Sequence, residues 1–189
     1  MSTLNSVRMT SEQFIMMGDD PPGIKLELAH GEIVKSPSPS PKHSWTLVKL
    51  IAILEPHIEQ HNLGELLSDL DTVFDPFNTR RPDLGFVSRR RGKLVGEKAV
   101  MGAPDLCIEI VSPGSERMDR RDKFTLFEKH GVKHYWIMDP QERTAEAFEL
   151  RRGQYELVTS GRDQQTVNFP PFIKLSIPLG KLWRPERAR

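Results

Sequence analysis

An acidic residue lies inside the most apolar segment of the chain. The run LCIEIV, residues 106–111, is apolar at every position except Glu109. Side chains alternate between the two faces of a strand, so Leu106, Ile108 and Ile110 share one face and Glu109 lies on the other. A buried carboxylate is costly unless a cation or a hydrogen-bond donor accompanies it. The segment therefore predicts a buried strand, in which Glu109 either has a positive partner or reaches water or an arginine at a sheet edge.

Helix and strand patterns surround this segment. Apolar residues recur at helical spacing after His43, at Leu47, Ile51, Leu54 and Ile58, and predict a helix. Pro56 either kinks that helix or divides it into two segments. Strands are predicted at residues 65–74, 82–87 and 105–111, then a helix at 116–130 and a short strand at 135–138. This order predicts an α/β fold of the mixed-sheet, α+β kind.

Short elements flank this core on both sides. Two hairpins are predicted, one from residues 25–28 and 32–34 around a glycine-bearing turn, the other from residues 145–150 and 155–159 around Arg152-Gly153. A capping box at residues 10–13 opens a short peripheral helix. The Ser-Pro run at residues 36–41 is expected to be an extended connector.

Length, hydropathy and cysteine content limit the class of protein. The 189 residues suit one domain, which we expect to span residues 1–189. No apolar run approaches the roughly 18 residues of a membrane span, and the N-terminus lacks a signal-peptide pattern, so we expect a cytoplasmic location. The single cysteine, Cys107, excludes an internal disulfide and a cysteine-rich zinc site. Cys107 and the three tryptophans are expected to be core or packing residues.

The net charge is only +1, so the chain is not a strongly basic nucleic-acid coat protein. One segment, residues 80–93, is nevertheless basic, because it carries six Lys and Arg residues against Asp83 alone. Such a cluster is either a solvated loop or a contact for nucleic-acid phosphates, and Arg89, Arg90 and Arg91 are the candidates for that contact.

Two other acids could join Glu109 at a metal site. Asp105 opens the same strand, but residues four apart along a strand are separated by roughly 13 Å, too far for both to bind one ion. Asp83 follows Pro82 at the start of the preceding strand and can approach Glu109 at cross-strand distance. Two carboxylates and water suit Mg²⁺ or Mn²⁺. Asp83 with Glu109 is therefore the predicted pair.

Several motifs together resemble a known nuclease family. They are RPDL at residues 81–84, APDLCIEIVSP at 103–113, Lys123, and GVKHYWIMDP at 131–140. Over nearly the whole chain they are similar to the Uma-two family of restriction-endonuclease-like proteins, which belongs to the PD-(D/E)xK nuclease superfamily. The resemblance implies a restriction-endonuclease-like core of helix, three strands, helix and strand. The residue pattern from His43 to Met138 gives the same order independently.

The resemblance also implies roles for individual residues. Asp83, Glu109 and the backbone carbonyl of Ile110 would bind the divalent ion. The superfamily lysine would fall two residues after the acid, where this chain has Val111. The Uma-two pattern carries a lysine on the following helix instead, here Lys123, whose ammonium would polarise the attacking water or hold a phosphate oxygen. The alternative is that Lys123 is a solvated lysine on a helix face.

Two further residues match family positions. Glu27 is either an extra acid at the metal site or a surface residue of the N-terminal hairpin. His43 is expected mainly to begin the helix, with a place at the site as the alternative.

The resulting hypothesis is a metal-dependent DNA endonuclease that uses Mg²⁺ or Mn²⁺, with a homodimer expected on the resemblance alone. Cleavage of RNA or branched DNA is compatible with the same chemistry. The alternative from another class is a catalytically silent nucleic-acid-binding or interaction module that keeps the nuclease fold, suggested by Val111 and by the near-zero net charge. An ammonium of Lys123 more than about 8 Å from both carboxylates would contradict its catalytic role.

Overall fold

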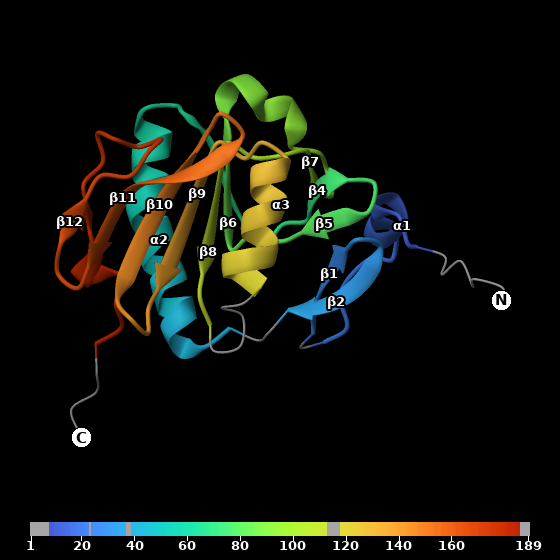
Figure 1. The fold of residues 1–189 in the computed structure, drawn as a ribbon, viewed down its shortest axis with the longest axis horizontal. Coiled ribbons are helices and arrows are strands. Elements are labelled where there is room, and N and C mark those ends of the chain that lie inside the picture. The colour runs from blue at the N-terminus through green and yellow to red at the C-terminus, as the bar shows by residue number, and fades with distance from the viewer. Residues whose placement is uncertain (1–7, 23, 37–38, 113–117, 186–189) are drawn as a thin grey trace.

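Among the residues that the structure describes, two mixed β-sheets and three α-helices form most of the fold (Figure 1). The computed structural model describes residues 8–22, 24–36, 39–112 and 118–185. Within them, one sheet has six strands in the order β11-β10-β9-β8-β6-β3, a second has five in the order β2-β1-β5-β4-β7, and β12 pairs with β13. This architecture confirms the predicted α/β class with mixed sheets.

The elements alternate along the chain much as the sequence predicts. In order they are α1 (Ser11–Met16), β1 (Lys25–Ala29), β2 (Glu32–Ser36), α2 (Pro41–Gln60), β3 (Gly64–Ser68), β4 (Thr72–Asp75), β5 (Asn78–Arg80), β6 (Leu84–Ser88), η1 (Arg89–Leu94), β7 (Val100–Met101), β8 (Leu106–Ile110), η2 (Met118–Lys123), α3 (Phe124–Lys129), β9 (His134–Asp139), β10 (Thr144–Arg151), β11 (Gln154–Arg162), β12 (Thr166–Val167), β13 (Ile177–Pro178) and η3 (Leu179–Lys181).

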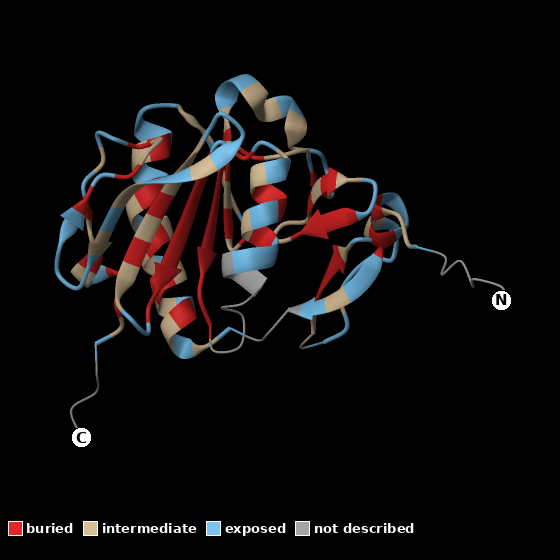
Figure 2. Ribbon diagram, in the orientation of Figure 1, coloured by how far each residue is buried: buried red, intermediate tan, exposed pale blue. Residues whose placement is uncertain are grey.

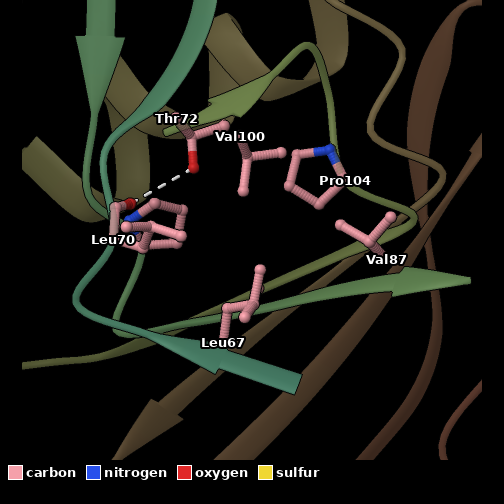
Figure 3. Close-up of a pocket in the computed structure, with 8 residues that line it drawn as sticks. Leu67, Leu70, Thr72, Val87, Val100 and Pro104 are labelled. Atoms are coloured by element: carbon pink, nitrogen blue, oxygen red, sulfur yellow. Dashed lines mark hydrogen bonds between the residues drawn. The ribbon is translucent and has the colours of Figure 1, made fainter. Parts of the chain in front are cut away.

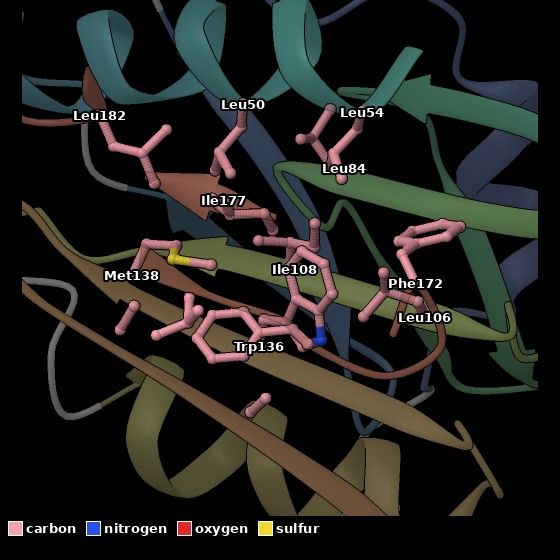
Figure 4. Packing of buried hydrophobic residues seen from close by; sticks show 14 of the residues in the cluster. Leu50, Leu54, Leu84, Leu106, Ile108, Trp136, Met138, Phe172, Ile177 and Leu182 are labelled. Carbon is pink, nitrogen blue, oxygen red and sulfur yellow. The ribbon is translucent and has the colours of Figure 1, made fainter. Parts of the chain in front are cut away.

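The acid-bearing strand β8 lies in the middle of the six-stranded sheet. It pairs antiparallel with β6 and parallel with β9, and all five of its residues are buried (Figure 2). Its apolar residues alternate as predicted. Leu106 and Ile108 pack toward α2 (Figure 4), whereas Cys107 packs on the opposite face with Leu126 and Phe127 of α3. The sheet is therefore covered by a helix on each side, and Glu109 lies on the α3 side.

Helix α2 begins where its sequence provides a cap. The Ser40 hydroxyl accepts the backbone N–H of His43 at 3.2 Å, and Pro41 occupies the first turn, where its missing N–H costs nothing. Pro56 lies inside the helix and does not divide it. The buried stripe consists of residues His43, Thr46, Leu50, Leu54 and Ile58, so the predicted positions Leu47 and Ile51 lie at its margin and are only half-buried.

The structure differs from the prediction in three elements. The strand predicted over residues 65–74 is two strands in different sheets, β3 and β4, because the chain turns between them, with Asp69 at φ 51°. Strand β5 was not predicted, since its three residues, Asn-Thr-Arg, are polar. The helix predicted over 116–130 is a π-helical segment, η2, followed by α3; residues 113–117 lie outside the described part of the chain.

The remaining short elements agree with the prediction. Thr10 and Gln13 form the capping box of α1, and the hairpins β1–β2 and β10–β11 have the expected turns. Residues 37–38 of the Ser-Pro connector are outside the described residues. No helix in the described part of the chain is long and apolar enough to cross a membrane.

Candidate active site

Three segments that are distant in sequence meet at one end of β8. Asp83 immediately precedes β6, Glu109 is the fourth residue of β8, and Lys123 ends η2 just before α3. Because Leu84 faces Ile108 in the antiparallel β6–β8 pair, one further step of the register places Asp83 opposite Glu109. The start of α2 and the start of α3 lie near this end of the sheet (Figure 1).

Lys123 contacts two carboxylates of the site. Its Nζ lies 2.9 Å from Glu109 Oε1 and 3.4 Å from Glu27 Oε1. All three side chains are buried, Lys123 at 4 % exposure, Glu109 at 2 % and Glu27 at 0 %. Lys123 is therefore not a solvated helix-face lysine, and its ammonium is far inside the 8 Å limit set from the sequence. Val111, at the position of the superfamily lysine, packs in the apolar cluster under α3.

Asp83 is fixed by two donors. Its Oδ2 accepts the backbone N–H of Ile110 at 2.8 Å and lies 3.0 Å from His43 Nε2. Burial alone would raise the pKa of Asp83, but the hydrogen bond and charge of His43, together with Lys123 and the Ile110 N–H, lower it below its usual value. His43 therefore does more than begin the helix, because its imidazole orients the Asp83 carboxylate.

Glu27 comes from the other sheet. Its Oε1 accepts the backbone N–H of Arg81 at 3.0 Å, and its Oε2 lies 3.4 Å from Arg80 NH1. Burial would raise the pKa of Glu27, but the charges of Lys123 and Arg80 lower it, so the carboxylate stays ionised. Glu27 is thus not a surface residue of the hairpin. The sequence pattern places Arg80 only within the basic segment and does not predict its contact with Glu27.

The basic segment does not form one surface patch. Arg80 is buried against Glu27, Arg81 pairs with Asp71 and Asp20, and Arg91 pairs with Asp105. The exposed basic residues Arg89, Arg90 and Lys93 follow β6, whereas Asp83 precedes it. At the rise of an extended strand, residues 83 and 89, which flank β6, are separated by about 20 Å. The arginines that were candidates for phosphate contact are thus remote from the carboxylates.

Asp105 and Cys107 lie close in sequence to Glu109 but have other roles. Asp105 Oδ2 accepts the backbone N–H of Ser88 at 2.7 Å, and its Oδ1 pairs with Arg91 at 3.2 Å. Burial and the nearby negative charge of Glu109 raise the pKa of the Cys107 thiol, which stays protonated in the core. Neither residue supplies a ligand or a nucleophile to the site.

The residues at the site fit a hard divalent cation. No group of three or more His, Cys, Asp and Glu side chains that could hold a metal occurs among the described residues. A metal would therefore rely on the two carboxylates Asp83 and Glu109, a backbone carbonyl and water, an all-oxygen set of the kind that Mg²⁺ and Mn²⁺ prefer. The Asp83 side chain keeps 13 % exposure, and in the described part of the chain its Oδ1 has no hydrogen-bond partner. That oxygen is available to a ligand.

A small pocket is lined by residues from both sheets (Figure 3). Its lining is almost wholly apolar, and the hydroxyl of Thr72 is already bonded to the Leu70 carbonyl at 3.3 Å. The lining residues are Leu67, Leu70, Thr72, Pro82, Gly85, Val87, Val100 and Pro104. Because no acid, base or cation lines it, this pocket supplies no chemistry, and the candidate site remains the charged group around Glu109.

Comparisons with known proteins give one family and one fold. Residues 11–180 match the model of the Uma2 family, described as "putative restriction endonuclease". A crystal structure of a putative nuclease belonging to DUF820 from Anabaena variabilis ATCC 29413 superimposes with a TM-score of 0.76, at 21 % identity, and covers 93 % of this chain and 97 % of that one. No functionally curated protein matches the sequence. The resemblance inferred from the motifs is confirmed.

Proposed function

The chain belongs to the Uma2 family, and from that premise we propose that it is a metal-dependent endonuclease that hydrolyses phosphodiester bonds in DNA. Family membership supports nuclease function in general. The observation that carries the finer proposal is the convergence of two carboxylates and one ammonium, Asp83, Glu109 and Lys123, at the buried end of β8. In this proposal the whole chain, residues 1–189, acts as one nuclease domain.

Asp83 and Glu109 are the proposed metal ligands, with the backbone carbonyl of Ile110 as a third. A bound Mg²⁺ or Mn²⁺ would lower the pKa of a water molecule and offset negative charge on the scissile phosphate. The protein holds both carboxylates in place beforehand. Glu109 is fixed by the strands on either side of β8, and Asp83 by His43 and the Ile110 N–H. Little reorganisation is then needed when substrate binds.

Lys123 is proposed to stabilise the negative charge that grows on the phosphate oxygens as water attacks. Its ammonium is held 2.9 Å from Glu109 in a buried site, where charge interactions are stronger than in water. In this proposal it acts as a cation, replacing the lysine that the superfamily carries on the strand at the position of Val111. Its place beside Glu109 favours an active nuclease over a catalytically silent module.

The test is cleavage of supercoiled and linear DNA by purified protein with Mg²⁺ or Mn²⁺, beside an EDTA control. We expect chelator-sensitive cutting that is lost in Asp83→Ala and Glu109→Gln and reduced in Lys123→Ala by about 10²-fold or more. Glu97→Gln, at an exposed position, serves as the control and retains activity. RNA and branched DNA, tested in parallel, decide the substrate class. Binding of DNA without cleavage of any form would favour the silent module.

A cytoplasmic location and a homodimer complete the proposal, and both rest on the sequence alone. Two copies of one site would allow both strands of a duplex to be cut. Sedimentation of the purified protein with and without DNA tests this, because a monomer in both conditions would contradict the dimer.

A further inference from the structure

Glu27 differs from the other two carboxylates of the site because its surroundings are positively charged on both sides. Its Oε1 lies 3.4 Å from the Lys123 ammonium and accepts the Arg81 N–H, while its Oε2 lies 3.4 Å from the Arg80 guanidinium. The side chain is completely buried. Both oxygens are thus occupied by donors of the protein itself.

Such a carboxylate would be a poor ligand for a divalent cation. To bind Glu27 it would have to displace a donor and approach two existing cations, Lys123 and Arg80, at short range. Asp83, in contrast, keeps an oxygen without a partner in the described residues and retains 13 % side-chain exposure. The extra acid that the sequence places at the metal site therefore has another task.

The role of Glu27 follows from the position of Lys123 in the chain. A lysine on a strand is directed by the strand, but Lys123 reaches Glu109 from the end of a helical segment on a flexible four-carbon chain. If Glu109 binds an ion, it can no longer serve as the main partner of the ammonium. Glu27 provides a second carboxylate, which the ion does not bind. The positive charge of Arg80 beside it favours the ionised form of that carboxylate.

We propose that Glu27, supported by Arg80, is a positioning residue that anchors the Lys123 ammonium beside Glu109, and is not a metal ligand. This inference rests on the proposed role of Lys123 in the nuclease reaction. The proposed role requires residues from both sheets. Glu27 and Arg80 belong to β1 and β5 of the five-stranded sheet, whereas Glu109 belongs to the six-stranded sheet.

The first test measures metal binding without catalysis. Mn²⁺ titrations, followed by electron paramagnetic resonance, compare Glu27→Gln with Glu109→Gln and with Glu32→Gln, an exposed carboxylate of the same hairpin. We expect Glu27→Gln to keep the Mn²⁺ affinity within about threefold of wild type, like Glu32→Gln, while Glu109→Gln loses about tenfold or more. A loss in Glu27→Gln equal to that in Glu109→Gln would overturn the proposal. If Glu27→Gln does not fold, Glu27→Asp, which keeps the charge, is measured in its place.

The second test is a double-mutant cycle in the cleavage assay at saturating Mn²⁺. Glu27→Gln alone is expected to lower kcat about tenfold or more, but less than twofold further when Lys123 is already methionine. The same loss in both backgrounds would show that Glu27 does not act through Lys123. If the wild-type protein cleaves nothing, the proposed function fails, whereas the Mn²⁺ comparison still decides whether Glu27 is a ligand.

Discussion

Replacing Lys123 with methionine removes a cation that contacts both Glu109 and Glu27. At an effective dielectric constant of about 20, the contacts at 2.9 Å and 3.4 Å correspond to about 6 and about 5 kcal/mol of attraction. Much of this is offset because the variant no longer buries an ammonium. The carboxylates stay buried, at 2 % and 0 % exposure, without that partner. We therefore expect Lys123→Met to lower the free energy of unfolding by about 3 to 5 kcal/mol at pH 8.

The pH dependence gives this prediction a sign. Burial would raise the pKa of Glu27, but the charge of Lys123 helps to lower it below its ordinary value. A carboxyl group whose pKa is lowered on folding contributes stability that is present above its unfolded pKa and is lost as pH falls through its folded pKa. The deficit of the variant relative to wild type should thus be largest at pH 8 and shrink at pH 4, where Glu27 begins to be protonated.

Urea denaturation at both pH values, followed by tryptophan fluorescence, to which the buried Trp136 contributes, measures the stability of the variant. Lys129→Met, at an exposed lysine of the following helix α3, is the matched control and should cost less than about 0.5 kcal/mol. A Lys123→Met variant as stable as Lys129→Met at pH 8, or one whose deficit grows on acidification, would refute the reasoning.

Three other predictions concern the site and its framework. His43→Ala should weaken Mn²⁺ binding about tenfold, and His43→Gln, whose amide can still donate to Asp83, should recover part of it in the same titration. Burial lowers the pKa of His134 to about 4, so wild type should lose about 2 kcal/mol relative to His134→Gln as pH falls from 7 to 4; equal acid sensitivity in urea titrations would contradict this. Gly64→Ala should cost about 2 to 4 kcal/mol, because its Cβ would lie 2.1 Å from a β6 carbonyl oxygen, whereas Gly85→Ala, at 3.7 Å from its nearest neighbour, should cost under about 1 kcal/mol by thermal denaturation.

Much of the fold follows from local patterns in the sequence. The alternation around Glu109 and the glycine turns of the hairpins depend on residues close in sequence, and both are found as predicted. The split of residues 65–74 between two sheets does not follow, because both halves have strand-like composition and only their pairing partners, β6 for β3 and β5 for β4, separate them. Local pattern predicts a strand but not the sheet to which it belongs.

The same limit applies to the site. The proximity of Asp83 and Glu109 could be predicted, since neighbouring strands and an acid in an apolar run restrict the arrangement strongly. The position of Lys123 came from the family resemblance, because a single lysine on a helix has no local signature. Arg80 could not be predicted at all: its partner Glu27 lies 53 residues away, and nothing in the sequence distinguishes this arginine from Arg81.

The charged residues of the site come from two sheets, and this affects the stage of folding at which the site is complete. Contacts between residues far apart in sequence form late, because the loop between them must first be closed. Glu27 must wait for Arg80, which is 53 residues further along, and then for Lys123. A partly folded chain in which only the six-stranded sheet has formed lacks the anchor of its lysine. A complete charged group therefore requires both sheets, and a chain in which the five-stranded sheet has not formed lacks Glu27 and Arg80 at the site.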